Sequence, residues 1–70
     1  MPFVQVTMLA GRTAAQKHAL IASVSQAVSE SLGTPIDRVR LAIYEVSQDE
    51  WGTGGVPMSV ARAGEAGVAP

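Results

Sequence analysis

The chain has 70 residues, five of them Lys or Arg, six Asp or Glu, one His and none Cys, which gives a net charge of −1. A domain of this length buries too little surface to be comfortably stable alone, and without cysteine neither disulfides nor thiolate metal sites can supplement its core, so we expect self-association and no metal. The scattered, nearly balanced charge argues against a nucleic-acid or membrane partner, and because the sequence shows neither a signal-like amino terminus nor a bilayer-length apolar run, we expect a cytoplasmic protein.

The first two elements that the sequence predicts are a strand and a helix. Apolar and polar side chains alternate over residues 3–9, as they do in a half-buried strand. Thr13 and Gln16 then have the spacing of a capping box, which predicts that a helix begins here. Apolar residues recur at three- and four-residue steps as far as Leu32 and form one stripe along the helix, and Gly33 is its natural end.

A second strand is predicted over residues 39–46, because this segment is rich in branched residues and follows Pro35, which cannot continue the helix. Two strands joined by a crossover helix run parallel in one sheet, so their starts share an edge and Pro2 becomes a neighbour of Val39. Arg40 lies on the face opposite the apolar row of its strand, which places a cation near this edge. One helix covers only one face of such a sheet, so we expect other subunits to cover the rest.

The remainder of the chain is predicted to form a hairpin and a tail. Residues 52–60 are rich in glycine and follow Trp51, which indicates a tight turn between two short strands. The last ten residues show no clear pattern, and we expect them to be loosely held. The sequence therefore predicts an α+β fold, with one β-α-β domain over residues 1–62, in which parallel strands are followed by a short C-terminal hairpin, and a tail over residues 63–70.

Pro2 is the residue most informative about chemistry, because removal of Met1 would make it the amino terminus. Proline would then carry a secondary amine, which can act as a base or as a nucleophile. Burial beside apolar groups or cations lowers the pKa of an amine and leaves the free base populated at neutral pH. Proline after the initiator methionine also has a simpler explanation, efficient removal of the methionine, so Pro2 needs partners before it indicates catalysis.

Several short motifs along the chain supply such partners. They are Pro2, Leu9-Ala10-Gly11-Arg12-Thr13, Gln16-Lys17, Ser31-Leu32, Thr34-Pro35, Val39-Arg40, Trp51 and Gly54-Gly55. In order and spacing they resemble the 4-oxalocrotonate tautomerase family, from residue 2 to about residue 62. The resemblance implies a β-α-β unit with a C-terminal hairpin that assembles as a homo-oligomer, typically a hexamer built as a trimer of dimers.

The resemblance also implies a reaction. Pro2 matches the catalytic proline of the family, a general base that takes a proton from the hydroxyl of a 2-hydroxy-dienoate, such as 2-hydroxymuconate, and returns one to a carbon further along, without a cofactor. Arg12 and Arg40 match two arginines that bind the ends of the substrate and polarise its carbonyl, a task that suits a planar and permanently charged guanidinium. The expected partners are a small dienol or keto acid and further copies of the chain.

Three further residues, Met8, Leu9 and Trp51, are expected to bind the substrate. Trp51 matches a family phenylalanine whose ring makes the pocket apolar, and the larger ring would narrow the site. A packing anchor between subunits is an equally good interpretation of this tryptophan. Lys17 and His18 are interpreted as solvated side chains of the helix.

Other functions stay open at this point. Relatives in the superfamily use the same proline to hydrate or dehalogenate haloacrylates with an added carboxylate that activates water, and Asp49 or Glu50 could supply that group. A non-catalytic oligomeric scaffold or small-ligand binder would instead tolerate the loss of Pro2 and of both arginines. The Val56-Pro57 sequence, where the family usually has no proline, leaves the substrate open, including the larger dienol of a biosynthetic relative.

Overall fold

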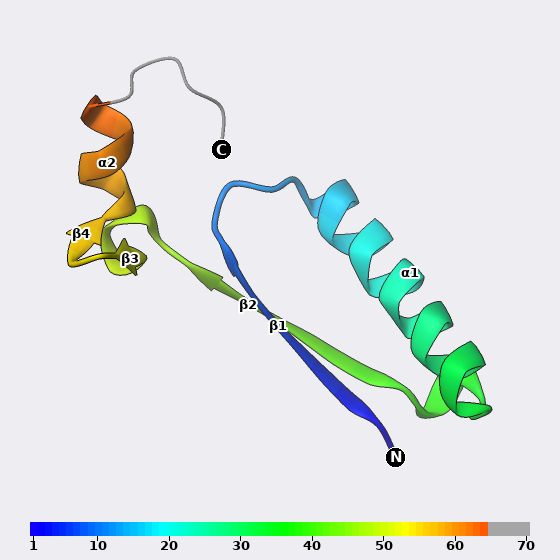
Figure 1. The fold of residues 1–70 in the computed structure, drawn as a ribbon. Helices are drawn as coiled ribbons and strands as arrows, with labels where there is room; N and C mark the ends of the chain where they lie inside the picture. Colours follow the sequence, from blue (N-terminus) through cyan, green and yellow to red (C-terminus); the bar gives the residue numbers. More distant parts are fainter. Residues whose placement is uncertain (65–70) are drawn as a thin grey trace.

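The computed structural model describes residues 1–64, and its two long strands lie side by side in a parallel sheet (Figure 1). Strand β1 (Phe3–Leu9) pairs with β2 (Arg40–Val46), with Phe3 opposite Arg40 and Leu9 opposite Val46. The backbone N–H of Arg40 also donates to the carbonyl of Pro2 at 3.0 Å. The predicted α+β fold with a parallel β-α-β unit is confirmed, and both strands start at the same edge of the sheet.

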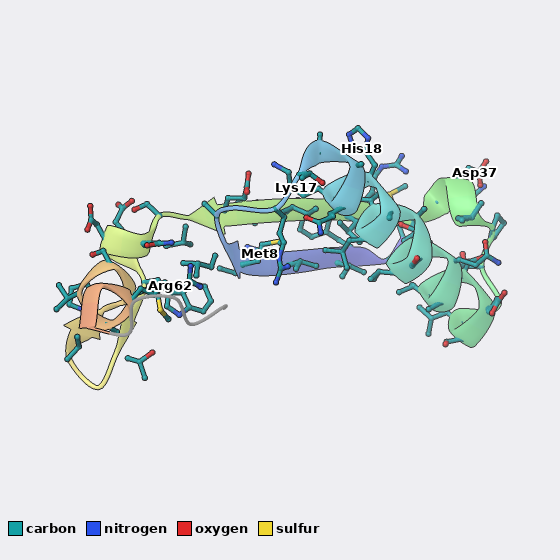
Figure 2. The ribbon with its side chains drawn as sticks, turned by 90° about the horizontal axis from the view of Figure 1, so that it is seen from above. Met8, Lys17, His18, Asp37 and Arg62 are labelled. Carbon is teal, nitrogen blue, oxygen red and sulfur yellow. The ribbon has the colours of Figure 1, made fainter. Side chains whose placement is uncertain are left out.

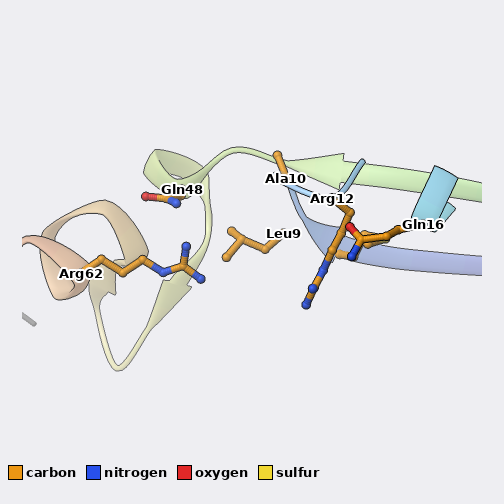
Figure 3. Close-up of a pocket in the computed structure, with 8 residues that line it drawn as sticks. Leu9, Ala10, Arg12, Gln16, Gln48 and Arg62 are labelled. Atoms are coloured by element: carbon orange, nitrogen blue, oxygen red, sulfur yellow. The ribbon is translucent and has the colours of Figure 1, made fainter. Parts of the chain in front are cut away.

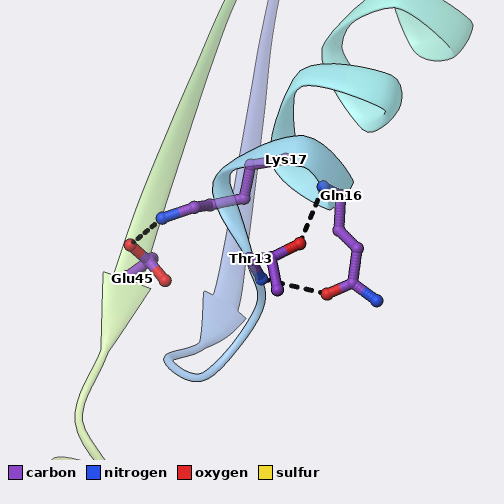
Figure 4. Close-up of polar contacts among 4 residues, drawn as sticks. All are labelled: Thr13, Gln16, Lys17 and Glu45. Carbon is purple, nitrogen blue, oxygen red and sulfur yellow. Dashed lines mark hydrogen bonds and ion pairs between the residues drawn. The ribbon is translucent and has the colours of Figure 1, made fainter.

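Helix α1 (Ala14–Leu32) connects the two strands, and both of its ends are capped as the sequence predicts. The Thr13 hydroxyl accepts from the backbone N–H of Gln16 at 3.1 Å, and the Gln16 amide oxygen accepts from the backbone N–H of Thr13 at 3.0 Å (Figure 4). At the other end Gly33 adopts a left-handed conformation, with φ of 64°, that terminates the helix. A short 3₁₀ turn, η1 (Ile36–Arg38), then leads into β2.

Helix α1 covers one face of the sheet. Lys17 of the helix and Glu45 of β2 form an ion pair at 2.8 Å (Figure 4), so the row of β2 side chains that includes Glu45 faces the helix. Lys17 is partly solvated, and its ion pair with Glu45 is a contact that the sequence did not predict. His18 is exposed on the outer side of the helix, as predicted (Figure 2). The opposite face carries Phe3 and Tyr44, whose side chains are 60% and 48% exposed.

The chain beyond β2 forms a small unit at the far end of the sheet (Figure 1). Its elements are the 3₁₀ turn η2 (Gln48–Glu50), strands β3 (Gly52–Thr53) and β4 (Val56–Pro57), and helix α2 (Met58–Gly64). The hairpin is shorter than predicted, because residues 58–64 are helical. Pro57 has no N–H to give to a longer ladder, and its restricted φ suits the residue that leads into a helix. Of the predicted tail, residues 63 and 64 belong to α2, and residues 65–70 lie outside the described residues.

The single chain has almost no core. Among the described residues no side chain is fully buried, and large apolar side chains such as Leu32 and Val60 are 65% and 59% exposed. The radius of gyration is 15.6 Å, whereas a compact chain of this length would have about 11 Å. Within the same part of the chain, no helix has both the length and the hydropathy needed to cross a bilayer. A fold this open needs further protein surface to become stable, so we expect the chain to self-associate.

We expect the thermal midpoint to rise with protein concentration, because a fold that is completed by association is stabilised by mass action. Tyr44→Glu places a charge on the open face of the sheet and should lower both the sedimentation mass and the thermal midpoint. His18→Glu adds the same charge at an exposed helix position and should change neither. A monomeric wild type with a concentration-independent midpoint would contradict this expectation.

Candidate active site

Pro2 and Arg40 lie together at the end of the sheet where both strands begin. Pro2 is half-buried, and its carbonyl is held by the backbone of Arg40. The Arg40 side chain is exposed, and its Nη1 donates to the backbone carbonyl of Asp37 at 3.0 Å. This hydrogen bond leaves the other guanidinium N–H groups available to a ligand. The predicted neighbourhood of the proline and a cation is therefore present.

A cavity of about 430 Å³ lies at the opposite end of β1 (Figure 3). The chain leaves β1 with Ala10, whose N–H donates to the carbonyl of Val46 at 2.8 Å, and turns at Gly11, whose φ of 133° is rarely adopted by other residues. This turn carries Arg12 to the cavity. The described residues that line it are Met8, Leu9, Ala10, Gly11, Arg12, Gln16, Gln48 and Arg62.

The polar side chains of this cavity are mostly hydrogen-bond donors. Arg12 enters from the β1–α1 turn and Arg62 from α2, and the amides of Gln16 and Gln48 lie with them (Figure 3). None of the described lining residues is acidic. Two guanidinium groups without a carboxylate partner among the lining residues favour an anion, and Met8 and Leu9 add an apolar wall. The cavity is thus suited to a carboxylate attached to an apolar carbon chain.

The six residues predicted for the site fall into separate groups within one chain. Pro2 and Arg40 lie at the start of β1, whereas Met8, Leu9 and Arg12 lie at its end. The 7 residues of β1 span roughly 23 Å. Figure 2 agrees, because Asp37, the partner of Arg40, lies at the opposite end of the molecule from Arg62. A single chain therefore does not bring the proline to the cavity.

Trp51 stands apart from both groups. It is half-buried between η2 and β3, its backbone carbonyl accepts from the N–H of Met58 at 2.7 Å, and it does not contribute to the lining of the cavity. Trp51 thus belongs to the hairpin unit and, within one chain, joins neither group of predicted site residues.

Three polar residues of the cavity escaped the sequence reasoning. Arg62 was missed because residues 58–64 were not recognised as a helix, although Pro57 before an alanine-containing segment was a signal for one. Gln16 was recognised as a cap and as part of a family motif, but not as a residue of the site. Nothing in the sequence around Gln48 marks it, because its position depends on where η2 turns the chain after β2.

The two carboxylates considered for water activation are held elsewhere. The Ser59 hydroxyl donates to Asp49 at 2.5 Å, and the Ser47 hydroxyl donates to Glu50 at 2.7 Å. Neither carboxylate lines the cavity. In residues 1–64 no three side chains of His, Cys, Asp or Glu gather where a metal ion could be held.

A family model described as "Tautomerase enzyme" matches residues 2–61. The chain belongs to the tautomerase family. A 2-hydroxymuconate tautomerase of Pseudomonas putida is 52% identical to this tautomerase over 56 residues, which is 80% of the chain and 89% of that relative. The crystal structure of TomN, a 4-oxalocrotonate tautomerase homologue of the tomaymycin biosynthetic pathway, matches it with a TM-score of 0.88 at 34% identity, covering 93% of the chain and all 100% of TomN.

A heterohexamer 4-oxalocrotonate tautomerase from Chloroflexus aurantiacus matches with a TM-score of 0.81 at 37% identity, over 84% of this tautomerase and 95% of that chain. The resemblance to the 4-oxalocrotonate tautomerases is thus confirmed, and so is the predicted enzyme class. The protein is a tautomerase-like isomerase.

Proposed function

We propose that the protein is a cofactor-independent tautomerase that converts a 2-hydroxy-dienoate such as 2-hydroxymuconate to its conjugated keto form. The observation that carries this proposal is the cavity with Arg12 and Arg62 and no acidic residue among its described lining. A conjugated dicarboxylate is complementary to such a lining. The similarity to a 2-hydroxymuconate tautomerase supports the same substrate class.

In the proposed reaction, the free amine of Pro2 removes the proton of the dienol hydroxyl. The electron pair of the O–H bond forms the carbonyl, the double bonds shift along the chain, and the distal carbon takes a proton back from the proline ammonium. Electron density that develops on oxygen is stabilised by a guanidinium more strongly than the ground state is. Arg12 and Arg40 provide these groups, and Met8, Leu9 and Trp51 provide apolar surroundings that favour the free amine.

The site is proposed to be completed across subunits. Pro2 and Arg12 of one chain lie beyond opposite ends of β1, whose 7 residues span roughly 23 Å. A substrate of this size would therefore contact both only if they come from different copies. Assembly of several copies would also cover the open sheet face. The heterohexameric relative from Chloroflexus aurantiacus supports a hexamer, and the family resemblance implies that such a hexamer is built as a trimer of dimers.

Loss of Pro2 or of either site arginine should remove most of the activity. We expect Pro2→Ala to lower kcat for 2-hydroxymuconate by roughly 100-fold or more, and Arg12→Ala and Arg40→Ala to lower kcat/KM by roughly 100- to 1000-fold. Arg38→Ala is the matched control, since Arg38 is an exposed arginine of η1 away from the cavity. Ketonisation followed by ultraviolet absorbance is the measurement. Wild-type rates in all three site variants would exclude the roles proposed for these residues, and no turnover by wild-type protein that has lost Met1 would favour a scaffold or binder.

Removal of Met1 is expected to be required for activity. While Met1 is attached, the nitrogen of Pro2 belongs to an amide and cannot act as a base. Protein whose intact mass includes Met1 should therefore be inactive. Treatment with methionine aminopeptidase should restore turnover in proportion to the fraction of molecules that have lost Met1. Full activity at the full mass would exclude Pro2 as the base.

Mixing two inactive variants tests whether the site is shared. If Pro2 and Arg12 of one site come from different chains, co-refolding Pro2→Ala with Arg12→Ala in equal amounts should restore about a quarter of the wild-type sites by random assortment. Refolding each variant alone is the control. If the mixture stays as inactive as its components, although mass spectrometry shows mixed oligomers, both residues of a site come from one chain.

A further inference from the structure

The capping box at the start of α1 holds the Gln16 side chain in one orientation. The backbone N–H of Thr13 is only a donor, so the atom that faces it at 3.0 Å must be the amide oxygen of Gln16 (Figure 4). The NH₂ group of Gln16 is therefore turned away from the helix end. Within the described residues, this NH₂ group donates to no protein acceptor.

The free NH₂ group belongs to the same site as Arg12. Gln16 and Arg12 both line the cavity of about 430 Å³, and both also line an adjoining cavity of about 290 Å³ with Met8 and Leu20. Figure 3 shows the two side chains together at the end of β1. The amide oxygen of Gln16 is already hydrogen-bonded to the backbone of Thr13. Towards a ligand in these cavities, Gln16 therefore acts as a hydrogen-bond donor through its NH₂ group.

We propose that Gln16 is a substrate-binding residue, whose NH₂ group donates a hydrogen bond to the carboxylate that Arg12 binds. This inference rests on the proposed function, because it takes that function's dicarboxylate as the ligand. A carboxylate has two oxygens with about four lone-pair directions, and a bidentate guanidinium uses only two of them. Gln16 supplies a donor for a remaining direction and so helps to determine which end of the substrate lies beside Arg12.

The position of Gln16 makes this donor rigid. Its other amide atom is already hydrogen-bonded to the backbone of Thr13, so the side chain needs little further ordering when the substrate arrives. A glutamine and a glutamate at position 16 would therefore present different groups to a ligand. A glutamate also completes a capping box, but it would place a carboxylate oxygen where Gln16 places its NH₂ group.

Two substitutions of Gln16 separate binding from capping. Gln16→Glu keeps the cap and replaces the donor by a negative oxygen, so we expect an unchanged or higher thermal midpoint together with a KM for 2-hydroxymuconate raised by about tenfold or more. Gln16→Met removes both the donor and the capping oxygen without adding charge, and it should raise KM by about tenfold. In both variants kcat should change less than KM, because Gln16 contacts the bound carboxylate and not the reacting proton.

Thr13→Ala is the matched control. It removes the hydroxyl half of the capping box but keeps the backbone N–H that orients Gln16. We expect a thermal midpoint lowered by roughly 4–8 °C and a KM within about twofold of wild type. If Gln16 has only a structural role, KM should instead rise in each of the three variants only as far as the thermal midpoint falls.

Calorimetric titration with trans,trans-muconate tests the inference independently of turnover. This conjugated dicarboxylate has the length of 2-hydroxymuconate but no hydroxyl, so its Kd reports binding alone. We expect the Kd to rise by about tenfold in Gln16→Met and to stay near the wild-type value in Thr13→Ala. If the wild type fails to turn over 2-hydroxymuconate, the proposed function fails. A higher Kd for muconate in Gln16→Met would still support Gln16 as a residue that binds a carboxylate. An unchanged Kd in Gln16→Met, or no muconate binding by the wild type, overturns the inference.

Discussion

The parallel pairing of β1 with β2 is the interaction on which the remaining structure depends. It places Pro2 and Arg40 at one edge, and it sets Glu45 on the face where Lys17 of α1 can reach it at 2.8 Å. A slip of one residue would turn every β2 side chain to the opposite face, so that Glu45 would lose its partner and Arg40 would point beneath the helix. The register therefore determines both the packing of the helix and the position of Arg40.

The same two-stranded sheet connects assembly with chemistry. A guanidinium in open solvent stabilises an anion weakly, because water screens the charge, and both Arg12 and Arg40 are exposed in the single chain. Covering the open face and the edges by other copies would remove this water and strengthen the interaction with a developing oxyanion. The surface that makes the isolated chain unstable is in this way the surface that a working site requires.

The sequence predicted the β-α-β unit well because its signals are local. Alternation in β1, the capping box at Thr13 and the left-handed Gly33 each act within a few residues. Arg62 and Gln48 were missed because they reach the cavity from segments that are placed by tertiary contacts. The ion pair of Lys17 was not predicted for the same reason, since its partner Glu45 is 28 residues away in the sequence.

In the proposed shared site, specificity would depend on residues of more than one chain. Trp51 lies outside the cavity of its own chain. In the proposed shared site, the shape of the pocket near the proline would therefore depend on how a neighbouring chain presents this ring. Within one chain, by contrast, the wall made by Arg12, Gln16 and Arg62 is complete. In the proposed enzyme the single chain would therefore recognise a carboxylate, whereas discrimination between a short dienol and a longer one would be decided at the subunit interfaces.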